Sequence, residues 1–119
     1  MKKILIIDDD PDILELLKII FRDSGHEVVF SQTAMDMAYI TVLHPDLILL
    51  DVRLTGSSRT GADICKELKT NPLTQKLPVL LCSGEYNLPE IARDCSADMY
   101  LVKPYELADL LSEVNKFLS

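Results

Sequence analysis

Short apolar runs alternate with amphipathic stretches from one end of the chain to the other, and this alternation restricts its fold more than any other feature. Runs such as ILII at 4–7 and LILL at 47–50 are apolar at every position instead of every second one. Strands of that kind are buried on both faces, as in parallel sheets covered by helices on both sides. Because strands and helices alternate, the sequence predicts stacked βα units and an α/β fold.

Each predicted strand is followed by a predicted helix. The strands are expected at residues 3–8, 27–31, 47–51, 80–83 and 99–102, and four of the helices at residues 33–43, 62–70, 88–95 and 106–118. The first helix is expected to begin with Asp10 as its N-cap and Pro11 in its first turn, and to end at Gly25. The second is expected to start near a cap at Thr33 and to stop before the His44-Pro45 pair.

Length and composition fit one domain in the cytoplasm. A chain of 119 residues is long enough for one core and too short for two domains. Its net charge of −7 and its lack of a basic stripe argue against direct binding to nucleic acid. The apolar stretch near the N-terminus is too short for a signal peptide or a membrane span. Three cysteines without metal-ligand spacing indicate reduced, mostly buried thiols, namely Cys65, Cys82 and Cys95.

Polar residues occur where the predicted strands end. Asp8 and Asp9 follow the first strand, Asp51 ends the third, Ser83 ends the fourth, and Lys103 follows the fifth. In open α/β sheets ligands bind at this edge. Two carboxylates roughly 5 Å apart repel by about 3 kcal/mol at an effective dielectric near 20, so three of them need a counter-ion. An oxygen-rich cluster suits Mg²⁺, and the sequence therefore predicts a divalent cation site.

Four motifs carry a family resemblance. ILIIDDD, PDLILLD, LLCSG and YLVKP occur in this order at 4–10, 45–51, 80–84 and 100–104. Together they resemble the response-regulator receiver domain, the phosphoacceptor part of bacterial two-component signalling. The resemblance implies a single receiver domain over residues 1–119. The implied architecture is the flavodoxin-like, doubly wound (βα)5 fold, with a parallel five-stranded sheet of order 2-1-3-4-5.

The resemblance also implies roles for individual residues. Asp51 would be the phosphorylated residue, and it would share Mg²⁺, or Mn²⁺ as a substitute, with Asp9, Asp8 and the backbone carbonyl of Arg53. Asp9 would bind the ion directly and Asp8 partly through water. A cis peptide is implied before Pro104. The residues that would stabilise the phosphoryl group are Ser83, Gly84 and Lys103, and those that would switch on activation are Ser83 and Tyr100.

By the same resemblance, the chain would receive its phosphoryl group from a histidine kinase or a histidine phosphotransfer protein. It would be no enzyme, but would assist its own phosphorylation and dephosphorylation. Phosphorylation would alter the face formed by the fourth helix, the fifth strand and the fifth helix. An unidentified downstream protein, or a second copy in a homodimer, would contact that face.

The chain departs from the family pattern in two loops. Leu54-Thr55 replaces a Met-Pro pair after the phosphoacceptor, Thr60-Gly61 replaces an Asp-Gly pair, and the loop between them is about two residues longer. The segment from Ser83 to Lys103 is about two residues shorter than usual. Arg53 and Glu85 each lie two residues beyond a site residue. They are either a charge pair that sets the lifetime of the phosphorylated state or two solvated surface charges.

Other interpretations are open at this point. A pseudo-receiver would bind partners without phosphate, and a haloacid-dehalogenase-type phosphatase would use Asp8 as nucleophile, with Asp10 as its second acid. Such a phosphatase needs a larger core and a cap, for which 119 residues are too few. The second predicted helix is apolar nearly all round, so its side chains form either a Met-rich contact surface or a partly buried face. These residues are Met35, Met37, Ile40 and Leu43.

Overall fold

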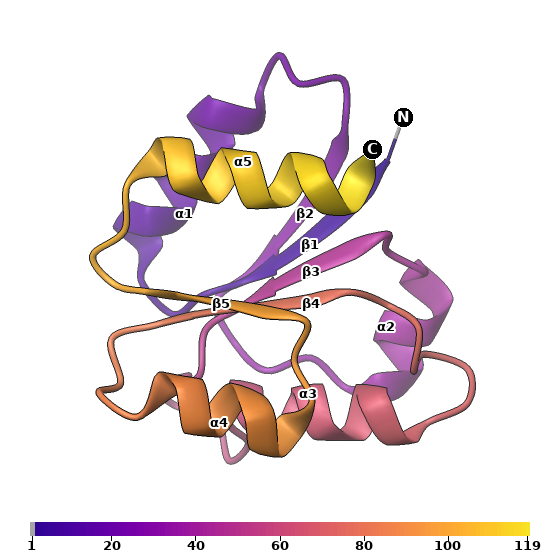
Figure 1. The fold of residues 1–119 in the computed structure, drawn as a ribbon. Coiled ribbons are helices and arrows are strands. Elements are labelled where there is room, and N and C mark those ends of the chain that lie inside the picture. Colours follow the sequence, from indigo (N-terminus) through magenta and orange to yellow (C-terminus); the bar gives the residue numbers. More distant parts are fainter. Residues whose placement is uncertain (1) are drawn as a thin grey trace.

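Strands and helices alternate along residues 2–119, the part of the chain that this computed structural model describes (Figure 1). In chain order they are β1 (Lys3–Ile7), α1 (Pro11–Phe21), β2 (Glu27–Ser31), α2 (Met37–Leu43), β3 (Leu47–Leu50), α3 (Gly61–Thr70), β4 (Val79–Ser83), α4 (Leu88–Cys95), β5 (Met99–Val102) and α5 (Leu107–Leu118). The strands form one sheet in the order β2-β1-β3-β4-β5, and every neighbouring pair is parallel. The predicted fold class and strand order are confirmed.

Helices cover both faces of the sheet. In Figure 1, α1 and α5 lie on one face, and α2, α3 and α4 lie on the other. Ile4 and Ile6 of β1 belong to the core cluster under α1 and α5, whereas Leu5 and Ile7 belong to the cluster under the other three helices. The apolar runs therefore do not alternate, because both faces of each central strand are core. The free thiols are buried as predicted, at Cys65, Cys82 and Cys95.

The first helix starts as predicted and ends earlier. The Asp10 side chain accepts a hydrogen bond from the Asp12 N–H at 2.9 Å, which confirms the N-cap. The helix was expected to continue to Gly25, but it ends at Phe21. There the backbone N–H and the hydroxyl of Ser24 both donate to the Phe21 carbonyl, at 3.1 and 2.8 Å. These bonds close a turn before Gly25 is reached.

The predicted start of α2 near Thr33 is wrong. The cap is Asp36, whose side chain accepts from the Tyr39 N–H at 2.9 Å. Thr33 is held in a loop because the Ser31 hydroxyl donates to its carbonyl at 2.8 Å. The next residue, Ala34, is held by a residue far away in the sequence, because its N–H donates to the Ser57 hydroxyl at 3.0 Å.

A Met-rich contact surface on α2 is also not found. Ile40 is fully buried, and Met35, Met37 and Leu43 are half-buried against the core. The side chains that α2 does expose are Tyr39 and Val42. The structure therefore supports the interpretation of α2 as a partly buried helix.

The last three helices lie close to their predicted bounds. α3 begins one residue earlier than expected, at Gly61, because Thr60 and Asp63 form a reciprocal capping box. α4 has the predicted bounds, and Glu106 is the N-cap of α5 instead of its first residue. None of the helices within residues 2–119 is long and apolar enough to cross a membrane.

Candidate functional site

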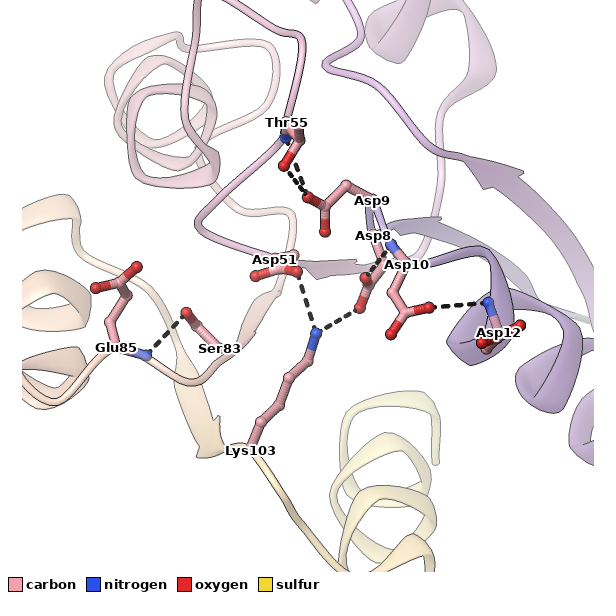
Figure 2. A network of polar contacts seen from close by, with 9 residues as sticks. All are labelled: Asp8, Asp9, Asp10, Asp12, Asp51, Thr55, Ser83, Glu85 and Lys103. Carbon is pink, nitrogen blue, oxygen red and sulfur yellow. Dashed lines mark hydrogen bonds and ion pairs between the residues drawn. The ribbon is translucent and has the colours of Figure 1, made fainter.

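The polar residues at the strand ends come together at one edge of the sheet (Figure 2). The Asp51 N–H donates to the Ile7 carbonyl at 2.9 Å, so Asp8 and Asp51 leave the sheet side by side. The Lys103 N–H donates to the Ser83 carbonyl at 2.8 Å. The strand order thus places residues from four separate parts of the sequence around one point.

Three carboxylates form the centre of this site. Asp8, Asp9 and Asp51 each offer one oxygen, and these oxygens lie within 4.8 Å of one another. Asp8 and Asp51 are buried, at 4% and 6% exposure, while Asp9 is half-buried. Hard divalent cations such as Mg²⁺ bind carboxylate oxygens, so these donors fit the cation that the sequence predicts.

Lys103 bridges two of the carboxylates. Its ammonium nitrogen lies 2.8 Å from Asp8 Oδ2 and 3.1 Å from Asp51 Oδ2. Burial opposes the charge of Lys103, but its hydrogen bonds and its attraction to the two carboxylates raise its pKa above the usual value. The lysine is therefore a cation at neutral pH. The peptide bond between Lys103 and Pro104 is cis, as expected.

Asp51 is less acidic than an ordinary aspartate. Burial is the largest cause and raises the pKa of Asp51 to about 6. The positive charge of Lys103 opposes this shift, and the negative charges of Asp8 and Asp9 add to it. Asp51 is thus mainly ionised at neutral pH, where its charge is attracted by Lys103 and repelled by Asp8 and Asp9.

Asp9 is held by a residue that sequence reasoning missed. The backbone N–H and the hydroxyl of Thr55 both donate to Asp9 Oδ2, at 3.1 and 2.7 Å (Figure 2). Burial alone would raise the pKa of Asp9, but these two hydrogen bonds help to lower it below the usual range. The signal in the sequence was the Leu54-Thr55 pair, because a proline at position 55 would have neither donor.

Asp10 has a different role from its two acidic neighbours. Its side chain is exposed and caps α1, as predicted, while its N–H donates to Asp8 Oδ1 at 2.9 Å. The third acid of the DDD run therefore helps to orient Asp8 through its backbone. It is not one of the three clustered carboxylates.

Sequence reasoning also missed the importance of Gly61, the first residue of α3, for the site. Its N–H donates to the Val52 carbonyl at 2.7 Å. A Cβ atom built on Gly61 would lie only 1.9 Å from the Asp51 backbone oxygen. Glycine is therefore required for the helix to approach Asp51 this closely, and the Thr60-Gly61 pair was the signal in the sequence.

Two of the three carboxylates, Asp9 and Asp51, line an open depression of about 300 Å³. In its rim, the Glu85 N–H donates to the Ser83 hydroxyl at 3.3 Å. The depression brings together most of the predicted site residues and is lined by Asp9, Asp51, Arg53, Ser83, Gly84, Glu85 and Lys103.

Three further predicted residues, Arg53, Glu85 and Tyr100, lie away from the carboxylate cluster. Arg53 and Glu85 form an ion pair of 3.1 Å at the rim of the depression, with side chains 76% and 27% exposed. Tyr100 lies on β5 opposite Leu81 and is half-buried against the core under α4. It does not line the depression.

Comparisons with known proteins agree with this geometry. Residues 4–115 match the family described as the response regulator receiver domain. The chain is 35% identical over 124 residues to the DNA-binding dual master transcriptional regulator RpaA of Synechocystis sp., covering 99% of this chain and 49% of RpaA. It is 32% identical over 120 residues to the phosphate regulon transcriptional regulatory protein PhoB of Pseudomonas aeruginosa, covering 98% of this chain and 52% of PhoB.

A solved structure extends the comparison to three dimensions. It is the signal receiver domain of a signal transduction histidine kinase from Syntrophus aciditrophicus. The two chains match with a TM-score of 0.86 and 28% identity, covering 99% of this chain and 90% of the other. The chain spans about half the length of the curated relatives that it matches.

These findings bear on the interpretations that the sequence left open. A dehalogenase-type phosphatase would need the second acid at Asp10, which is used to cap α1. The family match and the relatives do not favour that enzyme or a pseudo-receiver. From the order of its motifs, its fold and the residues gathered at the sheet edge, the chain belongs to the response regulator receiver domain family.

Proposed function

We propose that Asp51 accepts a phosphoryl group from a phosphohistidine of a histidine kinase or a histidine phosphotransfer protein. The observation that carries this proposal is the position of the Asp51 carboxylate, which faces an open depression and lies 3.1 Å from the Lys103 ammonium. An Asp51 oxygen forms the new bond to phosphorus, while the phosphorus–nitrogen bond breaks and its electron pair returns to the imidazole. The product is an aspartyl phosphate.

The chain's own residues supply most of the groups for this transfer. Lys103 stabilises negative charge on the phosphoryl oxygens, and the Ser83 hydroxyl and Gly84 N–H are available as hydrogen-bond donors in the same depression. Mg²⁺, when bound, neutralises charge on the phosphoryl oxygens and on the carboxylates around it. The residues proposed to hold it are Asp8, Asp9, Asp51 and the backbone carbonyl of Arg53, with Mn²⁺ as a substitute.

An apolar groove next to the site suits a docking phosphodonor. It has a volume of about 350 Å³, lies between α1 and the start of α5, and includes Lys103 in its wall. Leu16 and Leu107 line it and are 41% and 37% exposed. Because the groove is continuous with Lys103, a protein bound there would be adjacent to Asp51. The donor is therefore proposed to cover this groove during transfer.

Signalling is proposed to follow from Ser83 and Tyr100. Ser83 is 2% exposed at the end of β4, and Tyr100 is half-buried on the neighbouring strand. A phosphoryl group on Asp51 would attract the Ser83 hydroxyl, and Tyr100 would then turn inward behind it. This change shifts an existing equilibrium at the α4-β5-α5 face, where a downstream protein or a second copy would bind.

The rim pair is proposed to control how long the phosphoryl group persists. Arg53 and Glu85 both line the depression through which an attacking water would reach Asp51. Their 3.1 Å ion pair is proposed to restrict that access. The pair is therefore expected to slow hydrolysis of the aspartyl phosphate.

Residues 1–119 are proposed to act in the cytoplasm and through protein contacts. The name of RpaA includes DNA binding, but the alignment covers only 49% of that protein. The net charge of −7 disfavours contact between this chain and phosphate backbones. Direct binding to nucleic acid is therefore not part of the proposed function.

Incubation with acetyl phosphate and Mg²⁺ tests the central proposal. Mass spectrometry of the intact chain should show the addition of one phosphoryl group, which peptide mapping after borohydride reduction should place at Asp51. The Asp51→Asn variant should remain unmodified. A wild-type chain that stays unmodified would support the pseudo-receiver, and an adduct at Asp8 would support the phosphatase.

A further inference from the structure

The loop between β3 and α3 contacts the cation site through Thr55. Both hydrogen-bond donors of this residue converge on a single oxygen of Asp9, Oδ2, at 3.1 Å for the N–H and 2.7 Å for the hydroxyl. In Figure 2 the other oxygen of Asp9 points away from Thr55, toward Asp51. One oxygen of Asp9 is thus held by the loop, and the other is left to face the carboxylate cluster.

We propose that Thr55 is a positioning residue for the divalent cation, because it fixes the Asp9 side chain so that its second oxygen faces the cation site. This inference rests on the proposed function, since it assumes that Mg²⁺ binds among the three clustered carboxylates. It goes beyond that function by assigning the affinity for the ion partly to a residue that does not itself contact the ion.

The loop is anchored independently of Asp9. Leu54, the residue before Thr55, is 4% exposed and belongs to the core under α2, α3 and α4. On the other side, the Ser57 N–H donates to the Leu54 carbonyl at 3.0 Å, and the Ser57 hydroxyl accepts from the Ala34 N–H at 3.0 Å. Thr55 is therefore attached to the core and can hold Asp9 in place.

Asp9 needs such a restraint more than its neighbours do. Asp8 is buried and already bonded to Lys103 and to the Asp10 N–H. Asp9 is half-buried at the edge of the site, and repulsion from the other carboxylates favours rotation of its side chain into solvent. Two hydrogen bonds to a charged acceptor oppose that rotation. Groups that orient metal ligands in this way commonly change metal affinity by 10-fold or more.

Threonine is suited to this role by its chemistry. A proline at position 55 would have neither donor, a valine would keep only the backbone N–H, and a serine would keep both. Thr55 is exposed, so these replacements leave the core intact. Comparison of the valine and serine variants therefore isolates the hydroxyl from the rest of the loop.

Isothermal titration calorimetry with MgCl₂ tests the inference on the intact chain. Thr55→Val should weaken Mg²⁺ binding about tenfold, whereas Thr55→Ser should bind within about twofold of wild type. The matched control is Thr70→Val, which removes an exposed threonine hydroxyl at the end of α3, where it donates to the Lys66 carbonyl at 2.8 Å. This control should leave Mg²⁺ binding unchanged.

The rate of phosphorylation by acetyl phosphate provides a second measurement. In Thr55→Val the Mg²⁺ concentration for half-maximal rate should rise about tenfold, and the rate at saturating Mg²⁺ should stay within about twofold of wild type. General damage to the site would instead lower the saturated rate. Circular dichroism and the melting temperature without Mg²⁺ verify that each variant is folded.

Several outcomes would overturn the inference. The inference is wrong if Thr55→Val binds Mg²⁺ as tightly as wild type. It is also wrong if Thr55→Ser, which keeps both donors, weakens binding as much as Thr55→Val. Failure of the proposed function looks different. In that case wild type itself would show no Mg²⁺ binding, or Asp9→Asn would leave binding unchanged, and the positioning role of Thr55 would fall with the cation site.

Discussion

Asp51 is expected to destabilise the metal-free protein, so replacing it with asparagine should raise the melting temperature in EDTA. The Asp51 carboxylate is buried beside two other carboxylates, and its pKa rises from 3.8 to about 6 on folding. A raised pKa means that the folded state binds the proton more tightly than the unfolded state. Ionised Asp51 therefore weakens folding at neutral pH, and an uncharged amide of similar size removes this effect.

The magnitude follows from the shift in pKa. A change of about 2 pKa units corresponds to about 3 kcal/mol at a pH above both values. This shift already includes the opposing effect of Lys103, which lies 3.1 Å from Asp51 and lowers its pKa. The Lys103 side chain is 23% exposed, so water screens part of these charge interactions, and we expect a stabilisation of about 2 kcal/mol. For a domain of this length it raises the melting temperature by about 5–10 °C.

Thermal denaturation followed by circular dichroism measures the effect. In EDTA at pH 7.5, Asp51→Asn should melt at the higher temperature, and Asp23→Asn, at an exposed loop aspartate, should melt like wild type. As the pH falls through 6 toward 4, wild-type Asp51 takes up its proton and the difference should close. Added Mg²⁺ should stabilise wild type more than Asp51→Asn. A variant that melts below wild type in EDTA, or a difference that is independent of pH, would refute the reasoning.

Two further predictions concern the surroundings of Asp51. Gly61→Ala should lower the free energy of unfolding by about 3 kcal/mol in urea titrations, because its Cβ would collide with the Asp51 backbone; Gly84→Ala, with nothing within 4 Å of its Cβ, should change it by less than about 1 kcal/mol. Replacing both Arg53 and Glu85 with alanine should speed loss of the aspartyl phosphate about threefold, measured by the decay of ³²P label, with an unchanged decay rate contradicting the rim-pair hypothesis.

Sequence alone predicted the features of this chain that depend on local patterns. The uninterrupted apolar runs predicted strands buried on both faces, and Ile4 and Leu5 do pack into opposite cores. The position of Asp8 and Asp51 directly after such runs was enough to place both at one sheet edge. For Arg53 and Glu85 the sequence left two interpretations open, a charge pair or two solvated charges, and the structure shows an ion pair of 3.1 Å.

The features that were missed depend on contacts between distant segments. Thr33 has a side chain suited to capping, but the loop around it is bonded to Ser31 and, across 23 positions, by way of Ala34 to Ser57. The bond from Thr55 to Asp9 spans 46 positions. Local propensity carries no information about such partners, so the start of α2 and the restraint on Asp9 became visible only in three dimensions.

The ammonium of Lys103, placed between Asp8 and Asp51, gives the site a resident counter-charge that is covalently part of the chain. The acidic edge of the sheet can thus assemble in a magnesium-poor medium, since the positive charge it requires is delivered by β5 as the sheet closes. Folding of the chain and binding of the ion can therefore be separate events, and the three carboxylates are already clustered before the ion binds.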